Sequence, residues 1–538
     1  MIRVANLIGI ALVVLSFILV AFFYGKKELH MAQLEGYKIK NFFKWHFRNY
    51  DRWVKESLLA LLSAGIAFIM NIFRLPSEII ILVPIALFFY ITYKEVTTKK
   101  KAKKPLVFTA RATRLFLTFW LLIALSFYFL KKNFQAPEVF SAEVLILTAL
   151  LPVYMALSLV ITFPLEKFIQ FLYYKSAQRK IRNRKDLITI GITGSYGKTS
   201  TKHFITAVLS EKFSVLMTPE SYNTPMGVTK VIRNELKDTH QIFVCEMGAR
   251  QRGDIKVLVK LANPKIGVIT SIGPQHLETF GTIENVAKTK FELVEGLPED
   301  GIAVLNGDNY YCRTFGEKFA VRKLFYGTES PIERKYFLWA ENIINTRQGL
   351  KFDAVTEDGM RIKCEVPLLG RHNVSNLLAA ISVALALGLN EEEIKRGLSR
   401  IEPVPHRLQL ISTPHGVTVI DDAFNSNPEG AKEALACLKE MDAKRRIIVT
   451  PGMVELGEKE YEENKNLGKN IAEVCDYAIL VGKKRSRPIF EGLKEASFPE
   501  EKVFVVANLD EATKVLQNLL QPGDVVLFEN DLPDNYEG

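Results

Sequence analysis

The chain has 538 residues, of which 48% are hydrophobic, and its formal net charge is +11 at neutral pH. This length excludes a single small domain and allows three or four domains. The basic residues cluster beside apolar runs, which favours a membrane surface over nucleic acid as the reason for the positive charge. The cysteines are scattered with no C-x-x-C pair, so they support neither a zinc site nor a disulfide framework and fit reduced thiols in a cytosolic domain. They are Cys245, Cys312, Cys364, Cys437 and Cys475.

Five apolar segments occupy the region up to residue 185. They are roughly Ala5–Tyr24, Ser57–Phe73, Glu78–Tyr93, Leu115–Leu130 and Ala142–Phe163. A membrane span needs about 20 apolar residues, so the second to fourth segments require flanking residues or a thin bilayer. Because the runs are nearly free of charge, membrane helices are favoured over core helices of a soluble domain. A signal peptide is disfavoured for the first segment, since it lacks a convincing cleavage site and more spans follow.

Basic residues alternate between the connecting stretches. Lysine and arginine are abundant after the first, third and fifth segments and sparse on the alternate sides. By the positive-inside rule, this predicts five spans, an external N-terminus and a cytoplasmic location for everything after Lys185. The lipid bilayer is therefore an expected partner and nucleic acid is not, whereas protein partners and the oligomeric state stay open.

The stretch Leu187–Thr201 (LITIGITGSYGKTST) organises the rest of the chain. A β-branched apolar run, a turn with two glycines and a helix from Thr199 to Phe213 form a strand–loop–helix unit. Backbone N–H groups and the helix dipole favour phosphate at such a helix start. Lys198 adds charge for the phosphates, and the Thr199 hydroxyl can bind Mg²⁺. Ile192 stands where the full Walker pattern has glycine, but the context still favours phosphate binding over a plain helix start.

Strands and helices alternate after this loop, which predicts a mostly parallel sheet. The expected strands are Gln241–Met247, Lys265–Ile272 and Ile302–Asn306. Ligands of such sheets bind at the carboxyl ends of the strands, where Glu246 and the loop leading to His276 lie.

A series of short motifs follows in order along the chain. They are Thr193–Ser200 (TGSYGKTS), Ser221–Gly227 (SYNTPMG), Glu246–Arg250 (EMGAR), Ser271–Glu278 (SIGPQHLE), Ala287–Lys290 (AKTK), Asn306–Asp308 (NGD) and Leu369–Asn376 (LGRHNVSN). In this order they resemble the Mur ligase family. Asp421–Pro428 (DDAFNSNP) and Met453–Gly457 (MVELG) are similar to the MurF type, the UDP-N-acetylmuramoyl-tripeptide–D-alanyl-D-alanine ligases.

The resemblance implies ATP and two Mg²⁺ ions as cofactors, and it assigns site residues by their place in the motifs. The implied ATP-binding residues are Gly194, Ser195, Tyr196, Gly197, Lys198, Thr199, Ser200, Asn373, Asn376, Arg407 and Asp422. The implied catalytic residues are Lys198, His276 and Lys290. The implied substrate-binding residues are Asn223, Asn425 and Asn427. Thr199 and Glu246 would hold one ion, and His276 and Lys290 the other, with the lysine as a carbamate that supplies oxygen ligands.

Each assignment has a plain structural alternative. Glu246 could be an ordinary carboxylate at a strand end, and His276 an ordinary loop histidine. The lysine at position 290 could be an exposed helix lysine like Lys288. Asn373 and Asn376, which begin an expected helix at Asn373–Leu387, could simply cap it. The stretch Asp421–Pro428 could likewise be a capped helix start, with Pro428 in the first turn.

The fold class that follows is an α-helical membrane region, then an α/β P-loop central domain and a Rossmann-like C-terminal domain. The expected boundaries are 1–185, 186–402 and 403–538, with Pro403, Pro405 and Arg407 marking the second linker. Two stretches depart from the MurF type, namely 450–452 (TPG) and 528–533 (FENDLP), which leaves the amine substrate open. Since the central domain is expected to start almost directly after the fifth apolar segment, we expect no soluble module for a UDP-sugar before it.

We therefore expect a membrane-anchored, ATP-dependent and ADP-forming carboxylate–amine ligase of peptidoglycan precursor synthesis. A muramoyl-peptide carboxylate would attack ATP, and an amine, expected to be D-alanyl-D-alanine, would attack the acyl phosphate. One alternative is a ligase of a lipid-linked wall precursor or of another poly-amide. The other is an ATP-driven transporter, which is disfavoured because the apolar segments hold essentially no ionisable residues away from their ends.

Overall fold

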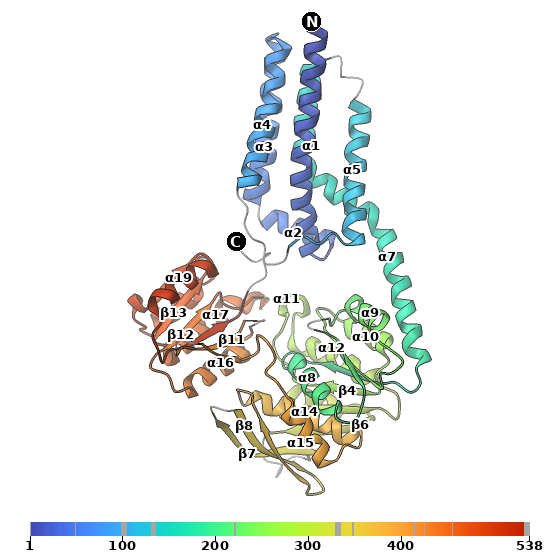
Figure 1. Ribbon diagram of the computed structural model, residues 1–538, viewed down its shortest axis with the longest axis vertical. Helices are drawn as coiled ribbons and strands as arrows, with labels where there is room; N and C mark the ends of the chain where they lie inside the picture. The colour runs from blue at the N-terminus through green and yellow to red at the C-terminus, as the bar shows by residue number, and fades with distance from the viewer. Residues whose placement is uncertain are drawn as a thin grey trace. The chain divides into compact units, whose positions relative to one another are not determined.

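The protein is described here from a computed structural model. The structure describes residues 2–48, 50–97, 105–130, 136–219, 222–328, 335–346, 349–413, 416–423, 426–454 and 456–531. It divides into two compact units, with the boundary between Phe171 and Leu172. The first unit is helical and the second is α/β (Figure 1).

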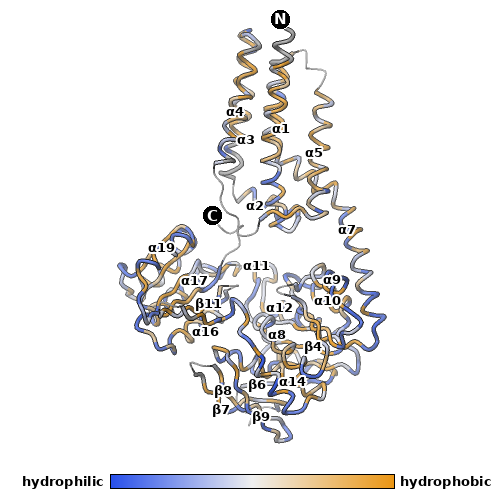
Figure 2. Tube along the Cα trace, in the orientation of Figure 1, coloured by the Kyte–Doolittle hydropathy of each residue, from blue (hydrophilic) through white to orange (hydrophobic). Residues whose placement is uncertain are grey.

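The N-terminal unit is a bundle of apolar helices. Its helices are α1 (Ile2–Leu34), α2 (Ile39–Arg48), α3 (Tyr50–Ile72), α4 (Ser77–Thr97), α5 (Ala110–Leu130), α6 (Pro137–Ala149) and the first part of α7 (Leu151–Asn183). Aromatic side chains such as Phe17, Phe88 and Phe140 fill its interior, while many large apolar side chains are exposed. Figure 2 shows hydrophobic residues along most of these helices.

Among the described residues, three helices are long and apolar enough to cross a membrane. They are Ile8–Leu34, Ala110–Leu130 and Leu151–Asn183. The apolar stretches of α3 and α4 are shorter, at Ser57–Ile72 and Ile79–Lys94. The five-span topology therefore stays a prediction.

The expected fifth span, Ala142–Phe163, is wrong as a single helix. Helix α6 ends at Ala149, Leu150 forms the junction and α7 begins at Leu151. The reason is Pro152, which has no N–H group to continue the hydrogen bonds of α6 but is well tolerated in the first turn of α7.

The second unit begins with a nine-stranded sheet in the order β2-β3-β1-β4-β5-β6-β7-β8-β9. The strands are β1 (Ile188–Thr193), β2 (Val215–Met217), β3 (Ile242–Glu246), β4 (Ile266–Ile269), β5 (Ile302–Asn306), β6 (Arg322–Gly327), β7 (Leu338–Thr346), β8 (Gly349–Thr356) and β9 (Arg361–Val366). Neighbours from β2 to β7 run parallel, as predicted. The antiparallel extension through β8 and β9 was not predicted.

Helices cover both faces of this sheet. One face packs against α8 (Lys198–Leu209), α14 (His372–Ala386) and α15 (Glu391–Ser399). The helices on the other face are α9 (Pro225–Asn234), α10 (Asp254–Ala262), α12 (Ile283–Glu295) and α13 (Tyr310–Gly316), joined by the last turns of α7. The short helix α11 (Leu277–Phe280) precedes α12. Side chains of β1 and β3 are buried, so the strand ends next to the glycine turn are rigidly held.

A second sheet follows, with six strands in the order β10-β11-β15-β12-β13-β14. The strands are β10 (Gln409–Ser412), β11 (Thr418–Asp422), β12 (Arg446–Thr450), β13 (Tyr477–Val481), β14 (Val503–Val506) and β15 (Val525–Glu529). Among the described strands of this second sheet, only β10 is antiparallel to its neighbour. The helices α16 (Pro428–Glu440), α17 (Glu460–Val474) and α18 (Arg487–Glu495) cover one face, and α19 (Leu509–Leu519) covers the other.

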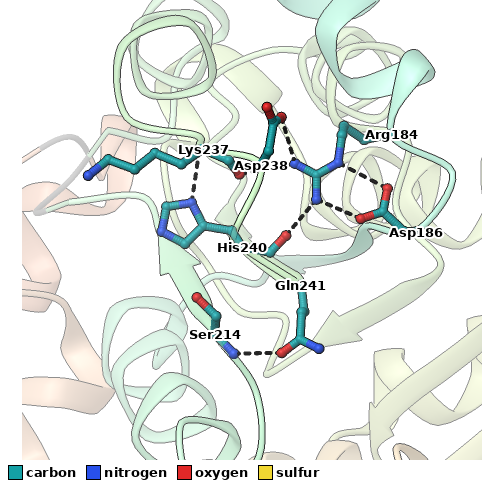
Figure 3. A network of polar contacts seen from close by, with 7 residues as sticks. All are labelled: Arg184, Asp186, Ser214, Lys237, Asp238, His240 and Gln241. Atoms are coloured by element: carbon teal, nitrogen blue, oxygen red, sulfur yellow. Dashed lines mark hydrogen bonds and ion pairs between the residues drawn. The ribbon is translucent and has the colours of Figure 1, made fainter.

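The end of α7 is fastened to the α/β unit by Arg184. Its guanidinium donates to Asp186, to the Asp238 carboxylate and to the backbone oxygens of Lys237 and His240 (Figure 3). These acceptors immediately precede β1 and β3, so one side chain ties the helix to the starts of both strands. The network holds the two strands whose opposite ends carry the candidate site.

The charge alternation predicts that Lys101 and Lys131 face opposite sides of the membrane. Both positions lie outside the described residues. A single cysteine at position 131 should react with an impermeant maleimide in intact cells, whereas one at position 101 should react only after the membrane is permeabilised. All five native cysteines are buried, so background labelling should be low. Labelling of both positions from the same side would show that the span count is wrong.

Candidate functional site

The turn between β1 and α8 has a shape that requires glycine at two positions. Gly194 has φ 154° and Gly197 has φ 78°, both in the region that disfavours L side chains. A Cβ on Gly194 would collide with the Thr270 hydroxyl, and one on Gly197 would collide with the Asn376 side-chain oxygen. The turn therefore brings backbone N–H groups close to any bound ligand at the start of α8.

Lys198 is the first residue of α8 and folds back over this turn. Its Nζ donates to the backbone oxygens of Gly194 at 2.7 Å and Ser195 at 3.1 Å. Burial lowers the pKa of Lys198 to about 8, with Glu246 opposing and Arg407 adding to that shift. Because its acceptors are loop carbonyls, the ammonium lies where it can turn toward a phosphate.

Glu246 stands at the end of β3, beside the last residues of β1, and is 1% exposed. Thr199 Oγ1 donates to its Oε2 at 3.1 Å, and Asn223 Nδ2 donates to its Oε1 at 3.0 Å. Burial raises the pKa of this carboxyl, but the charges of Lys202 and Lys198 and the Asn223 hydrogen bond outweigh burial, so the pKa is below its ordinary value. The carboxylate is thus ionised and fixed in place.

Lys202 is a site residue that the sequence analysis missed. Its side chain is fully buried, and its Nζ lies 3.2 Å from Glu246 Oε2. It lies one turn after Lys198 on α8, at the i, i+4 spacing that places two side chains on one helix face. That spacing was the signal available in the sequence. A lysine on the helix face that packs against the end of β3 is buried, and a buried lysine needs a partner of opposite charge.

The two lysines of the AKTK motif differ sharply in environment. Lys290 is 1% exposed on α12, whereas Lys288 is exposed to solvent. Burial, together with the nearby charge of Lys198, holds the pKa of Lys290 well below its ordinary value, against the opposing charges of Asp254 and Glu246. The alternative of an exposed helix lysine is therefore excluded for Lys290.

His276 occupies the left-handed region of backbone conformation, with φ 52°, immediately before α11. Two residues upstream, the loop packs under the glycine turn, because Tyr196 donates to the backbone oxygen of Pro274 at 3.2 Å. Ser195 and the backbone of Gly273 also exchange hydrogen bonds in this loop. His276 is thus placed by a loop that the glycine turn itself supports.

The first turn of α14 meets the same turn from the other side. Asn376 Oδ1 accepts from Thr201 Oγ1 at 3.2 Å, and its Nδ2 donates to Asn373 Oδ1 at 3.2 Å. Asn373 donates in turn to the backbone oxygen of Leu369. Ser200 is buried nearby on α8. These asparagines therefore join α14 to the glycine turn rather than only capping a helix.

The candidate ATP-binding residues Arg407 and Asp422 form a second group of charged side chains, separate from the group around Glu246. Burial lowers the pKa of Arg407, while Asp422, Glu246 and Glu529 raise it. Burial raises the pKa of Asp422, partly offset by Arg407, and Asp422 Oδ1 accepts from the backbone N–H of Leu408 at 3.2 Å. The charge of Arg407 thus acts on both groups.

Asn427 caps α16 by accepting from the backbone N–H of Gly430, with Pro428 in the first turn. This confirms the structural alternative for Asn427, and a substrate contact stays a prediction. Asn425 lies outside the described residues. Asn223 binds Glu246, so its side chain serves the carboxylate in this structure.

The oxygen atoms that the protein offers at this site suit a Mg²⁺ ion that takes most of its ligands from a bound substrate and water. Among the described residues, no group of three or more His, Cys, Asp or Glu side chains could hold a metal ion. One carboxylate and one hydroxyl are present, from Glu246 and Thr199, 3.1 Å apart. Mg²⁺ commonly takes one or two protein oxygens and completes its octahedron with phosphate oxygens and water, so these residues fit it.

A glycine turn between a central parallel strand and a helix, with a lysine, a hydroxyl and a carboxylate at its mouth, defines a nucleotide-binding α/β protein. Residues 192–384 match the Mur ligase middle domain, and residues 406–529 match the Mur ligase glutamate ligase domain. The chain belongs to the Mur ligase family. It is therefore an ATP-dependent amide ligase, a class that works with ATP and Mg²⁺.

Several relatives support this membership. The chain is 31% identical over 342 residues to the UDP-N-acetylmuramoyl-tripeptide–D-alanyl-D-alanine ligase of Bacillus subtilis, a match that covers 63% of this chain and 72% of the relative. It resembles the crystal structure of MurF from Acinetobacter baumannii, with a TM-score of 0.61, 27% identity and coverage of 68% and 78%. It also resembles MurF of Thermotoga maritima in complex with ADP, with a TM-score of 0.59, 27% identity and coverage of 67% and 80%. The expected resemblance and fold class are confirmed.

The buried ion pair makes a stability prediction. Lys202→Met should lower the free energy of unfolding by about 3–5 kcal/mol, because it leaves the Glu246 carboxylate short of a buried counter-charge. Adding Glu246→Gln to that variant should restore most of the loss. The measurement is urea unfolding of the detergent-solubilised chain, with Lys288→Met as the exposed control. A single variant as stable as the original chain would contradict a structural role for the pair.

Proposed function

We propose that the chain joins D-alanyl-D-alanine to the terminal carboxylate of a muramoyl tripeptide, with cleavage of ATP to ADP and phosphate. The observation that carries the proposal is the cluster of Lys198, Thr199 and Glu246 at the ends of β1 and β3. It supplies phosphate and metal contacts on a chain whose named relatives have this specificity.

In the proposed mechanism, the glycine turn holds the ATP phosphates with backbone N–H groups, and Lys198 leaves its loop carbonyls to stabilise charge on the γ-phosphate. A Mg²⁺ ion held by Thr199 and Glu246 would lower the repulsion between the phosphates and the incoming carboxylate. Lys202 and Asn223 keep the Glu246 carboxylate oriented. The tripeptide carboxylate attacks the γ-phosphorus and displaces ADP, which gives the acyl phosphate. The amine then attacks the acyl carbon, loses a proton and forms the amide as inorganic phosphate leaves.

Further ATP contacts are proposed for Asn373, Asn376, Arg407 and Asp422. Domain closure about the linker at Arg407 would bring the amine to the acyl phosphate and exclude water, which otherwise hydrolyses that intermediate. The charge of Glu246 acts on the pKa of Arg407, so the two groups of site residues are already close enough to interact electrostatically.

We also propose that Lys290 reacts with CO₂ to form a carbamate that, with His276, holds a second Mg²⁺ ion. Carbamylation needs a neutral amine, and burial of Lys290 lowers its pKa in that direction. A protonated amine in this position would repel a cation, whereas a carbamate offers anionic oxygen ligands.

The location proposed for the enzyme is the cytoplasmic membrane, with several spans and with the catalytic domains in the cytoplasm. The proposed domain division remains 1–185, 186–402 and 403–538. Strand β1 begins at Ile188, directly after α7 ends at Asn183, so no separate sugar-binding module stands between them. This observation favours a second candidate, in which the muramoyl peptide is already attached to a lipid.

A product assay tests the proposed reaction. Purified chain in detergent is given ATP, D-alanyl-D-alanine and either a UDP-linked or a lipid-linked muramoyl tripeptide, and products are identified by mass. We expect an amide product and ADP with at least one acceptor, and loss of product in Lys198→Ala. Lys212→Ala, which changes an exposed lysine three residues beyond the end of α8, is the matched control. No amide product with either acceptor would overturn the proposed substrate.

The lysine pair of α12 tests the second metal site. Lys290→Ala should lose ligase activity by at least about 100-fold, since a metal ligand is removed. Added short-chain carboxylates should restore part of the rate by occupying the vacated position. Lys288→Ala should be nearly unchanged. If Lys290→Ala keeps full activity, or if Lys288 proves to be the essential lysine, the carbamate assignment is wrong.

A further inference from the structure

Two carboxyl groups lie next to each other at the carboxyl ends of two strands of the second sheet. Asp422 ends β11 and Glu529 ends β15, and the two residues are register partners on these neighbouring parallel strands. Register partners point to the same face of a sheet, so both carboxyls lie on one face. Glu529 belongs to the stretch 528–533, which departs from the MurF type. The proposed reaction uses Asp422 at ATP but gives Glu529 no role.

The Glu529 carboxyl is 0% exposed, and a donor reaches one of its two oxygens. Ser426 Oγ donates to Glu529 Oε1, but no N–H or O–H group of the described residues donates to Oε2. Burial and the nearby charge of Asp422 raise the pKa of Glu529 well above its ordinary value, against the opposing effects of Ser426 and Arg407. A buried carboxylate oxygen without a donor is unfavourable, so Oε2 is the oxygen that can carry a proton.

Asp422 is the acceptor for that proton. Its side chain lies within hydrogen-bonding reach of Glu529. Ionised carboxylates only accept, so a hydrogen bond between the two groups needs one proton, and repulsion in a buried site keeps one of them protonated. Asp422 Oδ1 already accepts from the backbone N–H of Leu408 at 3.2 Å, and the charge of Arg407 stabilises its ionised form. The proton therefore belongs on Glu529 and the negative charge on Asp422.

Four titratable groups from neighbouring elements lie around this pair. They are Arg407 before β10, His372 in the first turn of α14, and Glu433 and Cys437 on α16. The guanidinium of Arg407 stays charged at neutral pH, whereas burial raises the pKa of the Cys437 thiol to about 12 and keeps it neutral. His372 lies 3.6 Å from Glu433, the carboxylate of its own ion pair. A protonated Glu529 thus leaves a single negative charge in the pair, opposite Arg407.

The residue after Glu529 holds the pair in place. The backbone N–H of Asn530 donates to the backbone oxygen of Asp422 at 3.1 Å, and its Oδ1 accepts from the Ser426 N–H at 3.3 Å. Its Nδ2 donates to the backbone oxygen of Gly452 at 2.7 Å. Gly452 belongs to 450–452, the other stretch that departs from the MurF type, so the two departures meet here. Glu529 is therefore part of a fixed network and cannot simply turn away from Asp422.

We propose that Glu529 is a positioning residue of the ATP site, in which its neutral carboxyl donates from Oε2 to the Asp422 carboxylate. This contact holds Asp422 for ATP and leaves Arg407 opposite one negative charge rather than two, so that its guanidinium can move to a phosphate. The proposal rests on the ATP contacts proposed for Asp422 and Arg407, but not on the identity of the amine. Ionisation of Glu529 would replace the hydrogen bond by repulsion.

The dependence of stability on pH tests for the proton. The folded chain keeps a proton that the unfolded chain releases above the ordinary glutamate pKa of about 4.3. Stability therefore falls as the pH rises, until the pH passes the raised pKa of the folded form. Glu529→Gln lacks this proton but keeps one donor and one acceptor. Between about pH 5.5 and 7.5, the unfolding constant of the original chain should rise about tenfold per pH unit relative to that of Glu529→Gln, the effect of one proton.

The measurement is urea unfolding of the full chain in detergent micelles. Lys198 and the other titrating groups are common to both chains, so the ratio of unfolding constants isolates residue 529. Glu501→Gln, which changes an exposed glutamate before β14, is the matched control and should keep the profile of the original chain. A ratio that does not change over this pH range would show that Glu529 is ionised and would overturn the proposal.

ATP binding tests the positioning role. Calorimetric titration with ATP and Mg²⁺ at about pH 7 should give Glu529→Gln a Kd within about twofold of the original value. Glu529→Leu cannot donate to Asp422 and should bind ATP about 10- to 100-fold more weakly, the effect of losing a hydrogen bond to a charged group. Equal affinity in all three chains, or an equal loss in both variants, would overturn the proposal.

Neither measurement requires turnover. Both expected results with a chain that makes no amide product would contradict the proposed reaction alone. Amide formation by a chain whose unfolding ratio does not change with pH would contradict the role of Glu529 alone.

Discussion

A single buried carboxylate, that of Glu246, connects the elements that make the site. It closes β3, accepts from Thr199 at the start of α8 and from Asn223 before α9, and pairs with Lys202 one turn further along α8. A buried charge is tolerated only when it is paired and hydrogen-bonded, so these partners are constrained as a group. The position of the glycine turn relative to the neighbouring strand follows from that constraint.

Other parts of the α/β unit support the same arrangement. The Arg184 network fixes the starts of β1 and β3, and the asparagines of α14 hold the glycine turn from the opposite side. The last turns of α7, directly before Arg184, carry the exposed basic residues Lys175 and Arg179.

Much of the site could be predicted from sequence because its motifs are local. The glycine turn and the carboxylate at the end of β3 depend on residues within one strand or loop. The preference for Lys290 over Lys288 came from the order of the motifs, and the structure shows that Lys290 is buried. Lys202 was missed because its role depends on what α8 faces, although its spacing from Lys198 was visible. The contact of Asn223 with Glu246 shows that a motif residue can have a structural task that its pattern does not reveal. The cap of α16 by Asn427, by contrast, could be expected from its place before Pro428.

The fold was harder to predict from sequence where pairing between strands determines the structure. The antiparallel strands β8 and β9 depend on pairing at the sheet edge, though the alternating burial of Arg361–Val366 is typical of a strand. The break between α6 and α7 follows from Pro152, whose effect was outweighed in the sequence analysis by continuous apolarity. Hydrophobic length alone therefore overestimates the continuity of a helix.

The most direct test of the central claim follows an oxygen atom through the reaction. The terminal carboxylate of the muramoyl tripeptide is labelled with ¹⁸O, and the chain is given ATP and D-alanyl-D-alanine. If the carboxylate attacks the γ-phosphate held at the glycine turn, one labelled oxygen leaves with the amine's attack and appears in inorganic phosphate beside ADP. Unlabelled phosphate, or label in AMP, would contradict the account.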